Sequence, residues 1–175
     1  LVPQSAVRNC DLARIGFGQT IAVSGIQLAC ATASAVNGGY YYTPHLVKRI
    51  YADDGYTLKS EFGGLKNRTV SEEASKKIAE MLEGVIRDGS GKKAGVEGYR
   101  IGGKTGTAQK YENGRIASGK YVSSFVGFFP VDNPKYLTLV IVDEPQGAYY
   151  GSVVAAPCAG EIFQGIIDLK NIQPS

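Results

Sequence analysis

The chain has 175 residues, of which 43% are hydrophobic and 20% charged. This length and apolar content suffice for one globular domain with a buried core, and we expect residues 1–175 to form a single domain. The 19 Lys and Arg residues against 16 Asp and Glu residues leave a net charge of only +3, which argues against a nucleic-acid partner. The longest apolar stretches fall well short of the roughly eighteen residues that a membrane-spanning helix needs.

A helix and a hairpin are predicted first. Ser24 can cap a helix over residues 25–36, which is apolar on nearly every face and is therefore expected to be buried. Residues 46–51 and 56–58 flank Asp53-Asp54-Gly55, a pattern that predicts a peripheral β-hairpin.

A second helix is predicted from Ser71, with two Glu residues in its first turn and apolar residues at amphipathic spacing. It should end before Gly89. Residues 89–95 are rich in Gly and Lys and are expected to form a flexible basic loop.

Three consecutive strands and a final helix follow. The strands are the segment around Lys104, residues 121–129 and residues 136–142, which together predict an antiparallel meander. Residues 152–169 can form a helix that lies on this sheet, with Pro157 tolerated in its first turn. Helices, then a sheet, then a covering helix indicate the α+β class, an antiparallel sheet meander packed by helices.

The cysteines and the single histidine indicate structural roles. Cys10, Cys30 and Cys158 are odd in number and lack a short Cys-x-x-Cys spacing, so we expect free thiols and no zinc site. His45 lies in a turn-like context, and a local Ser-His-Asp triad would have to use it. We expect neither a metal nor another cofactor.

The most informative motif is Lys104-Thr105-Gly106-Thr107, because Lys-Thr-Gly is one of three motifs from which acyl-serine transpeptidases and serine β-lactamases build an active site. On a strand beside a cleft, Lys104 would present a positive charge, while Thr105 and Thr107 would place two hydroxyls on one face. Gly106, without a side chain, would let a substrate backbone approach. Such a surface suits a peptide that ends in a carboxylate. The backbone N–H of Thr107 can also face a developing oxyanion.

A competing pattern covers the same segment. Residues 98–105 match G-x-x-x-x-G-K-[ST], the sequence of a nucleotide-binding P-loop. A P-loop follows a buried apolar strand and opens a helix, but neither side of this match carries an apolar run. A P-loop nucleotide-binding protein is therefore the less favoured alternative.

The two motifs that should accompany Lys-Thr-Gly are not found in usable form. No Ser-x-Asn occurs anywhere in the 175 residues. Ser90-Gly91-Lys92-Lys93 spells Ser-x-x-Lys, but it lies between glycines, where no helical turn would hold the Lys beside the Ser. The chain is therefore expected to supply one wall of an active site, without the nucleophile.

Several segments together resemble a known family. Residues 16–28, 37–39, 102–109 and 124–130 resemble, in the same order, the C-terminal part of the transpeptidase domain of class B penicillin-binding proteins. The resemblance extends from about Asp11 to Ile167 and is of the division or sporulation type of Gram-positive bacteria. It implies a partial penicillin-binding-protein or serine β-lactamase-like fold.

The resemblance implies a peptidoglycan D,D-transpeptidase. A serine would attack D-alanyl-D-alanine of a stem peptide, release D-alanine and pass the acyl group to a neighbouring amine, and β-lactams would acylate the same serine. In the family, the motif Lys, here Lys104, helps organise the middle-motif Ser and the substrate carboxylate. The motif hydroxyls, here Thr105 and Thr107, bind that carboxylate. The amide at Thr107 completes the oxyanion hole, so Lys104 and Thr107 are the candidate catalytic residues, and Gly106 permits close approach.

The resemblance also implies that the nucleophilic Ser, its Lys, the Ser-x-Asn motif and a membrane anchor precede residue 1. We expect the parent protein to act at the extracytoplasmic face of the cell membrane beside a glycosyltransferase, and this chain alone to be inactive. Missing strands would leave an open sheet edge that could drive self-association. The alternative is a non-catalytic peptide-binding or scaffold module with the same fold.

Overall fold

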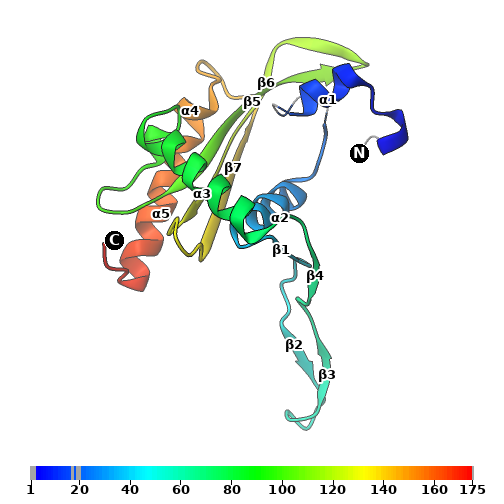
Figure 1. Cartoon of the computed structure of the whole chain (residues 1–175), viewed down its shortest axis with the longest axis vertical. Coiled ribbons are helices and arrows are strands. Elements are labelled where there is room, and N and C mark those ends of the chain that lie inside the picture. Colours follow the sequence, from blue (N-terminus) through cyan, green and yellow to red (C-terminus); the bar gives the residue numbers. More distant parts are fainter. Residues whose placement is uncertain (1–2, 17, 19–20, 175) are drawn as a thin grey trace.

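Figure 1 shows the chain as a computed structural model that describes residues 3–16, 18 and 21–174. Part of a segment that carries the family resemblance, Phe17, Gln19 and Thr20, lies outside the described residues. The elements follow in the order η1 (Gln4–Ala6), α1 (Asn9–Ile15), α2 (Gly25–Val36), β1 (Tyr40–Tyr42), β2 (Arg49–Tyr51), β3 (Leu58–Glu61), β4 (Leu65–Arg68), α3 (Glu72–Arg87), η2 (Lys92–Ala94), β5 (Gly102–Glu112), β6 (Arg115–Phe129), β7 (Tyr136–Asp143), α4 (Gly151–Val154) and α5 (Ala156–Lys170).

The central sheet is the antiparallel meander β5-β6-β7 that the sequence predicts. β6 begins at Arg115 rather than at residue 121, because Asn113 and Gly114 form a two-residue turn with φ angles of 51° and 76°. This turn reverses the chain at once, so that Glu112 pairs with Arg115. β5 and β6 therefore form a long hairpin.

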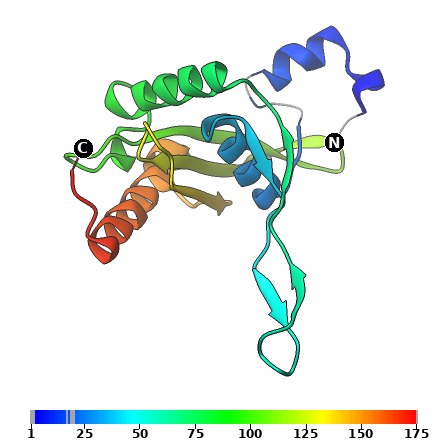
Figure 2. The same ribbon diagram turned by 60° about the horizontal axis from the view of Figure 1, so that its bottom comes forward.

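Each face of the sheet has its own core, because side chains alternate between the two faces of a strand. Phe125 and Phe129 of β6 lie in the core that α5 covers, where the rings of Phe129 and Phe163 meet edge to face with centroids 5.3 Å apart. Phe128 belongs to the opposite face and packs with Val36 of α2 and with α3. The sheet is thus a middle layer, with α3 on one side and α5 on the other (Figures 1 and 2).

The helix predicted after Ser24 forms with the expected bounds, but it is not buried. The Ser24 hydroxyl accepts a hydrogen bond from Gln27 N at 3.3 Å, and Ser24 N donates to Gln27 Oε1 at 2.9 Å, so α2 begins with a capping box. Burial is confined to Ser34 and Val36, whereas Ile26 is 58% exposed. The predicted burial is wrong because, within the described part of the chain, α2 packs on α3, β1 and β7 and its remaining surface is left open.

The hairpin predicted around Asp53-Asp54-Gly55 is confirmed and is peripheral. β2 and β3 pair antiparallel and project away from the rest of the molecule, as Figure 2 shows. Tyr40–Tyr42 form β1, a strand not expected from the sequence, which pairs with β4 at the base of this projection. A strand of three residues is too short for its alternation to be recognised in the sequence.

α3 begins at the predicted cap, where Ser71 Oγ accepts a backbone hydrogen bond of 3.1 Å. The prediction of a flexible loop at residues 89–95 is wrong, because this segment contains η2 and packs against α3 and α5. Gly91 and Ala94 are buried. The packing depends on glycine, since a Cβ on Gly91 would lie 2.6 Å from Ile86 Cδ1.

The final helix is divided at Ala155 into α4 and α5, and Pro157 lies in the first turn of α5 as predicted. By length and composition alone, Gly151–Lys170 could cross a membrane, and it is the one such segment in the part of the chain that the structure describes. Ala159 and Phe163 of α5 are fully buried in the core with the sheet. In this fold α5 is therefore the helix that covers the meander.

Candidate functional site

The Lys-Thr-Gly motif lies in β5, an edge strand. β5 pairs with β6, with Lys104 opposite Val126 and Thr107 opposite Ser123. Within the described residues, no strand lies on the other side of β5. An edge strand presents unpaired backbone N–H and C=O groups, to which an extended peptide can add as a further strand.

The pairing of β6 identifies the backbone groups at this open edge. Glu144 N donates to Tyr121 O at 2.9 Å, so odd-numbered residues of β6 bond to β7 and even-numbered residues bond to β5. In β5, the same alternation directs the N–H and C=O groups of Thr105 and Thr107 toward the open edge. The Lys104 ammonium donates to the Thr105 carbonyl at 3.0 Å, in agreement with this direction. The N–H of Thr107 is therefore available to a ligand at the edge.

The side chains of the motif are divided between the two faces of β5. Thr105 and Thr107 share one face, as predicted. Thr105 Oγ1 lies 2.9 Å from Ser90 Oγ, and Thr107 Oγ1 accepts a hydrogen bond from Gly151 N at 3.0 Å. Neither partner was expected from the sequence, because they lie 15 and 44 residues away along the chain. No local pattern signals such contacts.

Lys104 lies on the opposite face and is exposed. Among the described residues, no carboxylate lies within the 4.0 Å that defines an ion pair with its ammonium. Lys104 therefore has no ion-pair partner among these residues.

Gly151 can lie directly over the backbone of the motif because it has no side chain. A Cβ on Gly151 would lie 2.4 Å from the carbonyl oxygen of Gly106. The residues before Gly151 are anchored to β6, since Ser123 Oγ donates to the Tyr149 carbonyl and the rings of Tyr121 and Tyr149 stack with centroids 4.1 Å apart. Tyr149 therefore packs on β6.

An arginine fixes the start of β5 relative to its neighbours. Arg100 Nε and Nη2 donate to the two oxygens of Glu83 on α3 at 2.7 Å each, and Nη1 donates to Asp132 in the β6–β7 turn at 2.6 Å. The hydrogen bond from Arg100 holds the pKa of Glu83 below its usual range. This network joins three separate segments immediately before the motif.

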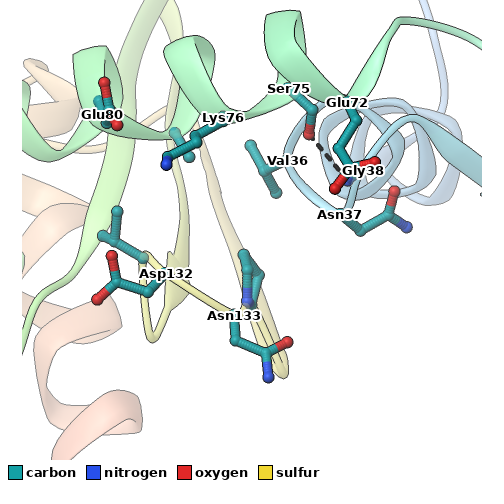
Figure 3. Close-up of a pocket in the computed structure, with 12 residues that line it drawn as sticks. Val36, Asn37, Gly38, Glu72, Ser75, Lys76, Glu80, Asp132 and Asn133 are labelled. Atoms are coloured by element: carbon teal, nitrogen blue, oxygen red, sulfur yellow. Dashed lines mark hydrogen bonds between the residues drawn. The ribbon is translucent and has the colours of Figure 1, made fainter.

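A pocket of about 420 Å³ lies away from the motif, between α3, the end of α2 and the β6–β7 turn (Figure 3). Glu72, Lys76 and Glu80 of α3 line one side and Asp132 lines the other, while Gly38 N donates to Ser75 Oγ at 2.9 Å. No residue of Lys104–Thr107 lines this pocket. We therefore place the candidate site at the edge of β5 and not in this pocket.

The structure contradicts the P-loop alternative. From Gly102 the chain continues as β5 to Glu112, so no helix N-terminus follows Lys104 to face a phosphate. Ser90 precedes the short η2 turn and opens no α-helix, in line with the expectation that it is not the nucleophile.

Among the residues that the structure describes, the cysteines and the acidic side chains form no metal site. Cys10, Cys30 and Cys158 are free thiols. Residues 3–16, 18 and 21–174 contain no group of three or more His, Cys, Asp or Glu side chains that could hold a metal ion.

Comparison with known proteins gives a consistent result over nearly the whole chain. The family model of the penicillin binding protein transpeptidase domain matches residues 3–164. The chain is 40% identical to stage V sporulation protein D of Bacillus subtilis over 99% of its own length and 27% of that protein. It is 34% identical to a peptidoglycan D,D-transpeptidase FtsI homolog of Mesostigma viride, over 95% of the chain and 30% of the homolog. The ampicillin complex of penicillin-binding protein 3 from Mycobacterium tuberculosis superposes on the entire chain with a TM-score of 0.84 and 26% identity, which covers 41% of that structure. The chain thus spans less than half of each of these proteins.

Proposed function

Because the chain belongs to the penicillin-binding protein transpeptidase domain family, we propose that it forms the C-terminal portion of one transpeptidase domain in a peptidoglycan D,D-transpeptidase. The predicted resemblance to class B penicillin-binding proteins and the predicted α+β fold are confirmed by the relatives of the chain. The observation that carries the functional proposal is the position of Lys104–Thr107 on an open strand edge, with the Thr107 N–H directed outward.

In this proposal, a stem peptide ending in D-alanyl-D-alanine lies along the open edge of β5. Its terminal carboxylate is bound by the hydroxyls of Thr105 and Thr107. The Lys104 side chain leaves the other face of β5, but its hydrogen bond to the Thr105 carbonyl holds the ammonium at the same open edge, where it supplies the compensating charge. Gly106 leaves room for the peptide backbone, because a side chain there would project from the strand. These groups bind and orient the substrate before any covalent step.

The chemistry begins when a serine from the rest of the domain attacks the carbonyl carbon of the penultimate D-alanine. The carbonyl oxygen becomes an oxyanion, and the Thr107 N–H donates a hydrogen bond to it. Collapse of this intermediate breaks the peptide bond, the proton lost by the serine passes to the departing amine of D-alanine, and an acyl-serine remains. The amine of a second stem peptide then attacks the acyl-serine, which forms the cross-linking amide, breaks the ester bond and returns the serine with its proton. A β-lactam would acylate the same serine. Because its amide bond is part of a ring, the amine formed on ring opening stays attached to the acyl group and does not depart.

The proposed partners are therefore stem peptides and β-lactams at the outer face of the cytoplasmic membrane, with a glycosyltransferase acting beside the parent protein. The M. tuberculosis relative is described as a complex with ampicillin, which supports the β-lactam part of this proposal. A non-catalytic scaffold with the same fold would bind peptides at the same edge and would not become acylated. Acylation is thus the reaction that separates the two functions.

The test compares the parent protein with this chain alone, by intact mass after incubation with benzylpenicillin. We expect one acyl group on the parent protein and none on the isolated chain. Lys104→Ala in the parent should slow acylation by about 100-fold, a typical loss when one group that stabilises the transition state is removed. Lys59→Ala, which removes an exposed lysine on the peripheral hairpin, is the matched control. No acylation of the parent would favour the scaffold, and labelling of the isolated chain would contradict the role proposed for it.

A further inference from the structure

The turn Gly89-Ser90-Gly91 brings a third hydroxyl to the Lys-Thr-Gly strand. Ser90 Oγ lies 2.9 Å from Thr105 Oγ1, and either atom can be the donor. Ser90 is exposed and Thr105 is half-buried, so the pair lies at the surface of the site. The hydrogen bond links the end of α3 to a residue that the proposed function places on the substrate carboxylate.

The position of Ser90 is fixed by the glycines on both sides of it. A Cβ on Gly89 would lie 2.9 Å from Val85 O, and a Cβ on Gly91 would lie 2.6 Å from Ile86 Cδ1, so both backbones pack closely on the last turns of α3. Gly91 N also donates to Val85 O at 2.9 Å. The turn is therefore held on α3, and Ser90 has little freedom to move away from Thr105.

The other end of the segment is held by the core. Ala94 in η2 is fully buried in the cluster that includes α5. Gly160 of α5 allows this contact, since a Cβ there would lie 3.0 Å from the Lys93 carbonyl oxygen. The loop between α3 and β5 is thus anchored on both sides of Ser90.

The direction of the hydrogen bonds follows from the chemistry of a hydroxyl, which has one proton to donate and two lone pairs to accept with. Thr107 Oγ1 already accepts from Gly151 N, so its proton is free to point to a ligand. A carboxylate can only accept. When Thr105 donates its one proton to a carboxylate, it has none left for Ser90. In the contact between the two hydroxyls, Ser90 must then be the donor and Thr105 Oγ1 the acceptor.

On this basis, and resting on the function proposed above, we propose that Ser90 is a positioning residue that donates its hydroxyl proton to Thr105 Oγ1 and so directs the Thr105 proton to the carboxylate of the substrate. Ser90 and Gly151 N then have the same role on two hydroxyls of one strand face: each supplies the donor that leaves a threonine proton for the ligand. A chain of two hydroxyls ending on a carboxylate also strengthens each hydrogen bond.

The test uses the full-length parent protein and two β-lactams that differ only at the carboxylate, benzylpenicillin and its methyl ester. We expect Ser90→Ala to lower the second-order acylation rate for benzylpenicillin about threefold to tenfold, the value of one hydrogen bond. The rate for the methyl ester should not change, because the ester lacks the anionic acceptor. Ser90→Thr should restore the rate for benzylpenicillin. Ser118→Ala, the same change at an exposed serine of β6, is the matched control.

The possible results distinguish failure of this inference from failure of the proposed function. An equal loss of rate with both ligands would mean that Ser90 has only a structural role, and no loss with either would remove any role, so both results overturn the inference. If the wild-type parent is acylated by neither ligand, the proposed function is wrong and the inference falls with it. If Ser90→Ala does not fold, Ser90→Thr and Ser90→Val replace it, because threonine and valine have the same shape and differ in the hydroxyl. The acylation rate for benzylpenicillin, relative to that for the methyl ester, must then fall in the valine variant and not in the threonine variant.

Discussion

Replacing Gly151 with alanine should separate α4 from the Lys-Thr-Gly strand. A Cβ at this position would lie 2.4 Å from the carbonyl oxygens of both Gly106 and Ser124. These are backbone atoms of two paired strands, so no side chain can rotate away to make room. The start of α4 must therefore move outward by more than about half an ångström, and the 3.0 Å hydrogen bond from Gly151 N to Thr107 Oγ1 should lengthen or break.

The cost can be estimated from two effects. Overpacking a well-packed region costs about 1–3 kcal/mol, and the lost hydrogen bond adds about 1 kcal/mol. We therefore expect Gly151→Ala to lower the free energy of unfolding of the chain by about 2–4 kcal/mol. For a chain of this size, each kcal/mol corresponds to roughly 2–4 °C in Tm, so the decrease in Tm should be about 4–16 °C. Urea denaturation followed by circular dichroism would measure the free energy, and thermal unfolding would measure the shift.

Gly165→Ala is the control, because it is the same substitution in the same part of the chain and should raise the free energy of unfolding where Gly151→Ala lowers it. Gly165 lies on the exposed side of α5, and a Cβ there would meet nothing within 4 Å. Alanine is preferred over glycine within a helix by about 1 kcal/mol, so this variant should be more stable than the wild type. A Gly151→Ala variant that matches or exceeds the wild type in stability would refute the steric argument, whatever the result at Gly165.

Three further predictions concern the core and the charged networks. Phe163→Ala should lower the free energy of unfolding by about 3–5 kcal/mol, since the ring is fully buried in the core of the sheet; a loss under 1 kcal/mol in urea denaturation would contradict this. Glu83→Gln should cost about 1–2 kcal/mol at neutral pH, because it removes the carboxylate partner of a partly exposed Arg100. Arg100 lowers the pKa of Glu83, so this stabilisation is present above the unfolded carboxyl pKa of about 4.3 and is lost as the pH falls through the lower folded value. A difference in unfolding free energy between Glu83→Gln and wild type that does not shrink in acid would argue against the pair. The hydrogen bond to Glu144 raises the pKa of Lys110 to about 12. The stabilisation that the protonated Lys110 provides should therefore be present below the unfolded pKa of about 10.4 and be lost as the pH rises toward 12. Lys110→Met should abolish this loss of stability in denaturation curves measured at high pH.

Several features of the fold were evident in the sequence because they depend on neighbouring residues. Ser24 and Ser71 cap α2 and α3 with contacts three residues away, so the starts of both helices could be predicted. The amphipathic spacing of α3 and the alternating runs of the meander are equally local signals. The Lys104–Thr107 motif and its strand could likewise be found by inspection. Long helices with caps, strands joined by tight turns and short chemical motifs are the elements that sequence reasoning recovers.

The contacts that complete the site were decided by tertiary structure. The sequence marks Gly89-Ser90-Gly91 as a flexible loop, and only the packing of both glycines on α3 shows that it holds Ser90 against Thr105. Gly151 reaches Thr107 because α4 starts above the sheet, 44 residues later in the chain. The open edge of β5 and the exposure of Ile26 on α2 depend on which elements lie beside them. Local propensity determines which residues form a helix or a strand, but which side chains meet across elements depends on the packing of the whole fold, where a single missing Cβ can decide whether two segments touch.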